Sequence, residues 1–204
     1  MGSQTIELTE TPADMEPPIF ETSWQKLMMW FFIVTDALLF SGYLASYMFS
    51  RLASESGWPV QAEAFNMNFI TVMTFTLLTS SATMACAVKA AKLEDHAQAR
   101  KYLLFTVLIG AGFLALQAIE WSHFIGAGAT LTENPWGAPA FSAYFFMMTG
   151  FHGLHVLIGV VILLVTYLHT TPVRMDADKV EVAGLYWHFV DLVWVFIFGC
   201  FYLL

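Results

Sequence analysis

Three apolar stretches of this chain each carry a pair of ionisable side chains three residues apart. The pairs are Glu120 with His123, His152 with His155, and His188 with Asp191. Residues three apart lie on one face of a helix, so both members of a pair can point toward the same neighbour. A further carboxyl group, Asp36, stands alone in another apolar stretch.

Carboxylates and imidazoles on facing helices can do three kinds of chemistry. They can ligate a metal or haem iron, and pairs of the Glu-x-x-His kind occur in di-iron bundles. They can relay protons, as intramembrane acid and histidine chains do. They can also hydrogen-bond across helices and fix the bundle's register, each bond contributing about 0.6–2 kcal/mol. A metal site needs its ligands at one depth in the membrane, whereas these acids and imidazoles are spread over two depths. We therefore favour structural hydrogen bonding first and proton relay second.

The composition indicates that these residues lie in a membrane. Of the 204 residues, 58% are hydrophobic and only 12% are charged, whereas a soluble domain carries about 25% charged residues. A membrane-spanning helix needs about 20 mostly apolar residues. Five stretches qualify: 27–49, 68–90, 102–125, 141–168 and 183–204. The sequence therefore predicts an all-α, polytopic membrane protein, a bundle of five transmembrane helices.

The basic residues predict how the bundle is oriented. With five spans, seven of the eight Lys and Arg residues fall on the side of the N-terminus: Lys26, Lys89, Lys92, Arg100, Lys101, Arg174 and Lys179. The other side has only Arg51. Because cytoplasmic loops are enriched in Lys and Arg, we expect the N-terminus inside and the C-terminus outside.

The chain divides into a leader and one domain. Residues 1–23 contain five acidic residues and no Lys or Arg, which predicts a flexible acidic leader. Residues 24–204 then form a single transmembrane domain. The net charge of −8 argues against a nucleic-acid partner, since such proteins present basic surfaces.

The rise of the helix places the acids and imidazoles at two depths. At about 1.5 Å per residue, the level about 9–15 Å from the cytoplasmic ends holds Asp36, His188 and Asp191. A second level, about 20–30 Å deep, holds Glu120 and His152. We therefore expect an inner and an outer cluster, and His155 can join either.

Other polar and small residues in the spans suit packing. Seven Ser and Thr residues in 68–90 can bond their own helix backbone or let a neighbouring helix approach. Gly150, Gly153 and Gly159 flank the histidines and predict close helix contact. Cys86 and Cys200 are far apart in apolar runs, so we expect buried packing rather than a disulfide or metal role.

Two long motifs carry a resemblance to a known family. "TGFHGLHVLIG" (149–159) and "YWHFVDLVW" (186–194), in this order, resemble subunit III of the haem-copper terminal oxidases. "WFFIVTDALLFSGYLASY" (30–47) resembles that family's span with an embedded carboxylate, and "GFLALQAIEWSHFIGAG" (112–128) its span with Gln and Glu. The resemblance runs from about residue 24 to 204, and five spans match the shorter bacterial form.

The resemblance implies a chain that is not catalytic by itself and holds no metal or redox cofactor. It implies a contact with the catalytic subunit I, which carries the haems and copper, and tight binding of phospholipid. It also implies support of proton uptake by subunit I in a bacterial cytoplasmic membrane. Asp36 corresponds to the family's embedded carboxylate, and the span histidines and Asp191 to its other intramembrane polar residues.

The sequence leaves several alternatives open. A subunit of the same family associated with nitric oxide reductase fits the same motifs. An independent membrane protein that binds haem or metal fits the histidine pairs. For an oxidase, either cytochrome c or quinol can be the electron donor.

Overall fold

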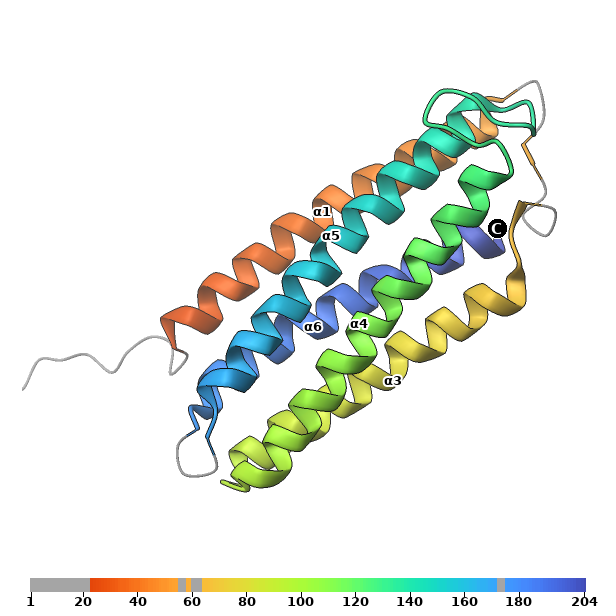
Figure 1. The fold of residues 1–204 in the computed structure, drawn as a ribbon. Helices are drawn as coiled ribbons and strands as arrows, with labels where there is room; N and C mark the ends of the chain where they lie inside the picture. Colours follow the sequence, from red (N-terminus) through yellow and green to blue (C-terminus); the bar gives the residue numbers. More distant parts are fainter. Residues whose placement is uncertain (1–22, 55–57, 60–63, 172–174) are drawn as a thin grey trace, which may run out of the picture.

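The chain is a bundle of long helices in the computed structural model, which describes residues 23–54, 58–59, 64–171 and 175–204 (Figure 1). Within these ranges, five helices are long and apolar enough to cross a membrane. They are α1 (Trp24–Leu52), α3 (Met67–Lys92), α4 (His96–Gly126), α5 (Pro139–His169) and α6 (Ala177–Ile197). The π-helical segment η1 (Phe198–Leu203) continues α6. The five predicted spans are confirmed; the acidic leader predicted for 1–23 lies, apart from Ser23, outside the described residues.

The helices extend beyond the apolar stretches because polar residues cap them. Ser23, Asn66, Asp95 and Asp176 each accept a hydrogen bond from the backbone N–H three residues on. A short polar side chain at this position satisfies an N–H group that the helix leaves free. Hydropathy marks only the part of a helix suited to lipid, so it places the ends too far inward.

The charged segment 92–101 is mostly helix, contrary to the long connection that the sequence suggested. Only residues 93–95 separate α3 from α4. Glu94 adopts a φ of 59°, a left-handed conformation that reverses the chain in a few residues. Asp95 then accepts from the Gln98 N–H at 3.1 Å and starts α4. The tight turn holds α3 and α4 antiparallel and in close contact.

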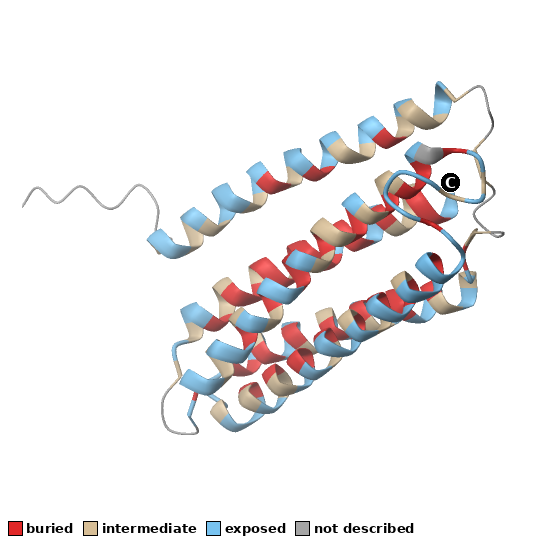
Figure 2. Ribbon diagram, turned by 45° about the horizontal axis from the view of Figure 1, so that its top comes forward, coloured by how far each residue is buried: buried red, intermediate tan, exposed pale blue. Residues whose placement is uncertain are grey.

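Helix α6 is the centre of the bundle and α1 is its periphery. Helices that follow one another in the chain run antiparallel, so α1, α4 and α6 run in the same direction (Figure 1). The start of α1 lies at the same end as the α3–α4 turn, while the C-terminus lies at the opposite end. In the most apolar window of α6, 56% of residues are buried, against 11% in α1. Figure 2 shows the same contrast as mainly exposed and half-buried residues along α1.

Trp187 of α6 contacts three other helices, α3, α4 and α5. The indole is fully buried, and its Nε1 donates to Ser80 Oγ of α3 at 3.0 Å. Gly110 of α4 and Gly159 of α5 lie against the ring, where an added Cβ would be 2.5 and 2.9 Å from ring carbons. Close packing at Gly159 confirms the sequence prediction, and Gly153 is likewise pressed against Gln117.

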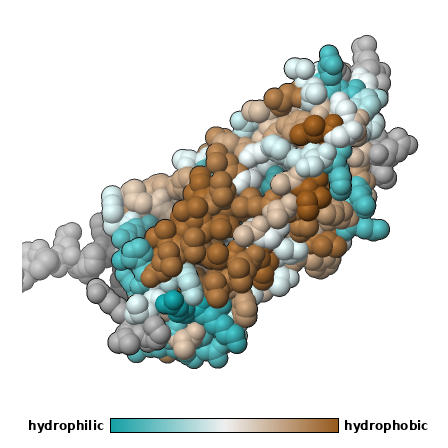
Figure 3. Space-filling view, in the orientation of Figure 1, coloured by the Kyte–Doolittle hydropathy of each residue, from teal (hydrophilic) through white to brown (hydrophobic). Residues whose placement is uncertain are grey.

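The outer surface is apolar around the middle of the bundle. Figure 3 shows a broad hydrophobic area there, with hydrophilic residues toward the ends. Leu154, Leu157 and Val161 of α5 are among the exposed apolar residues. Cys86 is also exposed, so its predicted burial is wrong. A helix inside a membrane can present small apolar side chains outward, so burial could not be inferred from hydropathy.

Candidate functional site

The buried acid of α1 meets an imidazole of α5. Asp36 Oδ1 lies 3.5 Å from His155 Nε2, and these residues are 7% and 8% exposed. His155 Nδ1 lies 2.8 Å from the Phe151 carbonyl oxygen, which can only accept. Nδ1 therefore carries a proton, and a neutral ring turns a lone pair on Nε2 toward the carboxyl group. Such a ring can accept a hydrogen bond from Asp36 when that carboxyl group is protonated.

Helix α6 positions this pair. The Tyr186 hydroxyl donates to the His155 carbonyl oxygen at 3.0 Å, and its ring stacks on Phe32 of α1 with centroids 5.8 Å apart. Asp36 Oδ2 has no hydrogen-bond partner among the described residues. The Asp36–His155 pair thus has one unbonded acceptor, Asp36 Oδ2, on α1, the least buried helix.

Glu120 is bonded to the C-terminal segment and not to a histidine. The Tyr202 hydroxyl of η1 donates to Glu120 Oε1 at 2.8 Å. His123, one turn further along α4, is exposed, so the expectation that Glu120 and His123 point inward together is wrong. Positions three apart differ by about 60° around a helix, which is enough to place one on each side of a narrow buried face.

His152 packs as an aromatic ring. It is fully buried, and it stacks on Trp194 with centroids 5.3 Å apart and planes inclined by 30°. Phe113 meets it edge-on at 6.0 Å. Neither ring nitrogen has a hydrogen-bond partner within the part of the chain that is described. The predicted outer cluster of Glu120 with His152 is therefore not formed as a hydrogen-bonded pair.

The α6 pair faces α3. Ser81 Oγ lies 2.7 Å from His188 Nδ1 and is close to the Asp191 carboxyl group. Asp191 is 4% exposed, and neither of its carboxyl oxygens has a hydrogen bond among the described residues. The predicted inner cluster is only partly right. Asp36 pairs with His155, which the depths allowed to join this cluster, whereas His188 is bonded to Ser81.

The partners that sequence reasoning missed are mostly hydroxyl groups. The hydroxyl-rich span was expected to bond its own backbone, and Thr71, Thr76 and Thr79 do so. Thr74 and Ser80 also bond their own backbone, and in addition they accept from indoles of α6. Ser81 reaches His188 of α6. Tyr202 gave no signal, since it stands in an apolar end segment. Within residues 23–54, 58–59, 64–171 and 175–204, no three His, Cys, Asp or Glu side chains gather as metal ligands would.

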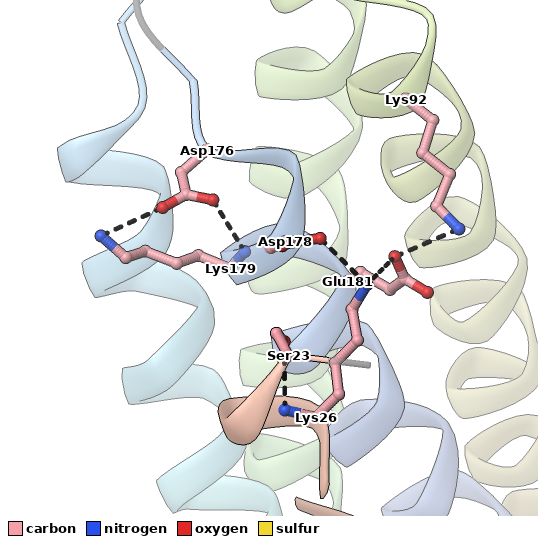
Figure 4. A network of polar contacts seen from close by, with 7 residues as sticks. All are labelled: Ser23, Lys26, Lys92, Asp176, Asp178, Lys179 and Glu181. Atoms are coloured by element: carbon pink, nitrogen blue, oxygen red, sulfur yellow. Dashed lines mark hydrogen bonds and ion pairs between the residues drawn. The ribbon is translucent and has the colours of Figure 1, made fainter. Parts of the chain in front are cut away.

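Ion pairs join three helices at the end where α1 begins (Figure 4). Lys26 of α1 lies 2.9 Å from Asp178 and 3.0 Å from Glu181 of α6. Glu181 also lies 3.1 Å from Lys92 at the end of α3. At the opposite end of α1, two serine hydroxyls bond the Tyr144 hydroxyl of α5 at 2.7 and 2.8 Å. Polar contacts at both ends and in the middle therefore hold the helix that buries least apolar surface.

The fold and these contacts define a five-helix integral membrane protein in which buried acids and imidazoles join helices. The family model "Cytochrome c oxidase subunit III" matches residues 20–204. The chain is 32% identical over 196 residues to "Cytochrome c oxidase subunit 3" of Alkalihalophilus pseudofirmus, covering 95% of this chain and 93% of that protein. It is 33% identical over 183 residues to "Quinol oxidase subunit 3" of Bacillus spizizenii, covering 87% and 86%. The chain belongs to the cytochrome c oxidase subunit III family, as the motifs indicated.

Proposed function

We propose that this chain is a non-catalytic subunit III of a bacterial respiratory haem-copper oxidase. In this role it stabilises the catalytic subunit I, supports its proton uptake, and binds phospholipid during oxygen reduction. The observation that carries the proposal is the family match over nearly the whole chain. The haems and copper belong to the partner subunits, and this chain supplies helices and protonatable groups.

The proposed location is the bacterial cytoplasmic membrane with the N-terminus inside. Among the described residues, six Lys and Arg side chains belong to the end where α1 begins: Lys26, Lys89, Lys92, Arg100, Lys101 and Lys179. Arg51 belongs to the opposite end. The positive-inside rule supports this orientation.

Asp36 is the proposed proton-linked or lipid-linked residue. The other intramembrane polar residues chiefly hold the bundle: Glu120, His152, His155, His188 and Asp191. Asp36 differs because it faces an imidazole and lies on the most exposed helix. A carboxyl group in that setting can take up a proton without leaving a net charge in the membrane.

The variant Asp36→Asn tests this role. We expect the complex to assemble but to show slower proton uptake or earlier loss of activity during turnover, because the amide cannot take up a proton. The matched control is Thr35→Val, since the Thr35 hydroxyl bonds only carbonyl oxygens of its own helix, at 3.1 and 2.9 Å. Equal turnover and durability in the two variants would refute the role of Asp36.

Co-purification tests the function as a whole. A tagged chain extracted from native membranes in mild detergent should bring down a haem- and copper-containing oxidase that consumes oxygen. Activity with reduced cytochrome c or with quinol then identifies the electron donor, which relatives of both names leave open. Capture of a nitric oxide reductase, or a Soret band in the isolated chain, would replace the proposal with one of the alternatives. The relatives named here are oxidase subunits, which favours the oxidase.

A further inference from the structure

We propose that Asp191 is a buried proton-binding group that exchanges its proton with one end of the bundle through Ser81 and His188. The route starts in a surface groove between α3 and α6. This inference deepens the proton-linked part of the proposed function. Its experiment reads the carboxyl group of Asp191 itself, so the result does not depend on whether the chain serves an oxidase.

The groove links a charged end of the bundle to His188. Its volume is about 460 Å³. Its walls are mainly apolar, and its polar lining consists of Lys89, Lys92, Glu181 and His188. The Lys92 side chain is 55% exposed, so this end is open to water, and Figure 4 shows Lys92 and Glu181 facing each other there. From Glu181 to His188 is two helical turns, or about 10 Å along α6.

One hydroxyl group lies close to both His188 and Asp191. Ser81 Oγ is 2.7 Å from His188 Nδ1, and it is near the Asp191 carboxyl group without a hydrogen bond to it in this structure. The two residues of α6 are one turn apart, and Ser81 approaches both from α3. A hydroxyl group can donate and accept at once, which is what a link between an imidazole and a carboxylate requires.

The transfer is balanced in protons and breaks no bond between heavy atoms. A hydrated proton in the groove binds to His188 Nε2 and leaves a neutral water molecule. The ring then releases the proton on Nδ1 to Ser81 Oγ, and the hydroxyl passes its own proton to a carboxylate oxygen of Asp191. The ring is left neutral with its proton on Nε2, and Asp191 is a neutral acid. The reverse sequence returns the proton to the groove.

Asp191 lacks the partners that fix the other buried acids. Asp36 faces an imidazole directly and Glu120 accepts from a tyrosine. Both carboxyl oxygens of Asp191 are without a hydrogen bond from the described residues, and Asp191 is 4% exposed. Lys89 and Lys92 stand at the mouth of the groove, and Lys92 is already paired with Glu181. An unpaired carboxylate at this depth favours protonation, so the route to the groove decides how fast the proton comes and goes.

Infrared spectroscopy of the purified membrane complex tests the route. A protonated carboxyl group gives a C=O stretching band that shifts when its hydrogen is replaced by deuterium. The band that is missing in Asp191→Asn belongs to Asp191. If that variant does not assemble, isotope-labelled aspartate in an Asp36→Asn background selects the band instead, since Asp36 is the other buried aspartate of the described residues. After transfer to heavy water, we expect the rate of this band shift to be at least about tenfold lower in Ser81→Ala than in the wild-type protein.

Thr79→Ala is the matched control, because Thr79 lies on the same helix and, among the described residues, its hydroxyl bonds only the Phe75 carbonyl oxygen. It should exchange at the wild-type rate, and His188→Phe should exchange as slowly as Ser81→Ala. A spectrum unchanged by Asp191→Asn would show that Asp191 holds no proton. Equal exchange rates in Ser81→Ala and Thr79→Ala would show that the proton takes another route.

Discussion

Replacing Gly110 by alanine should destabilise the bundle, although alanine is the better helix former. A Cβ at this position would lie 2.5 Å from Trp187 Cη2, 2.8 Å from Cζ2 and 3.1 Å from Val160 Cγ2. The indole cannot retreat, because its Nε1 is bonded to Ser80 at 3.0 Å and its other edge rests on Gly159. Forcing a methyl group into a packed core typically costs about 1–3 kcal/mol.

Gly112 provides the control on the same helix. Nothing lies within 4 Å of a Cβ built there, so Gly112→Ala should show only the gain in helix propensity, about 0.8–1.0 kcal/mol. This propensity gain is common to both variants, so their free energies of unfolding should differ by the cost of the clash alone, about 1–3 kcal/mol. The same chemical change thus has opposite signs two residues apart.

Unfolding of the purified chain in mixed detergent micelles, with increasing denaturing detergent, measures this difference. Trp187→Phe should relieve the clash because the smaller ring withdraws from Gly110. In a double-mutant cycle, the double variant Gly110→Ala with Trp187→Phe should lose less free energy of unfolding than the two single variants lose in sum. The difference should be about 0.5 kcal/mol or more. A Gly110→Ala protein as stable as Gly112→Ala, or strictly additive losses, would refute the role given to Trp187.

Three further substitutions test individual contacts. Tyr202→Phe should cost about 1–3 kcal/mol of unfolding free energy, since it leaves Glu120 buried without its donor; an unchanged unfolding curve would contradict this. Tyr144→Phe removes the hydroxyl that bonds two serines of α1, and it should speed amide hydrogen exchange in that end of α1 and not in α4. Burial tends to raise the pKa of Asp176, but hydrogen bonds and the ion pair with Lys179 outweigh it and hold the pKa below its usual value. The stabilisation from Asp176 is therefore present at neutral pH and lost as the pH falls through that lowered pKa. Asp176→Ala also removes the helix cap, so hydrogen exchange at the start of α6 should become faster, whereas Asp176→Asn keeps a capping side chain and should leave this exchange slow.

The number and approximate position of the spans could be predicted because burial in lipid acts on every residue of a helix alike. Hydropathy therefore identified all five helices within the described residues. It failed at their ends, where a capping side chain such as Asp95 decides the boundary. It also failed for Cys86, since an apolar residue in a membrane gains nothing from facing inward.

The pairing of the polar residues could be predicted only in part. Spacing correctly placed His152 and His155 together on the buried face of α5. The depths of the residues along their helices suggested that Asp36 would join Asp191. This prediction failed because depth does not say how each helix is rotated about its axis. Asp36 meets His155 because α1 lies against α5 and α6 at that level, and this rotation follows from packing along the whole length of α1.

The sequence alone determined that the chain has five apolar spans, which of these spans carry acids and imidazoles, and which family the motifs resemble. These follow from composition, from a span length fixed by lipid, and from local spacing. The tertiary structure decided which groups meet: Asp36 with His155, Glu120 with Tyr202, and His188 with Ser81. A side chain's partner depends on the rotation and tilt of two helices far apart in the chain, and those are set by contacts such as Trp187 on Gly110 that only the assembled bundle contains.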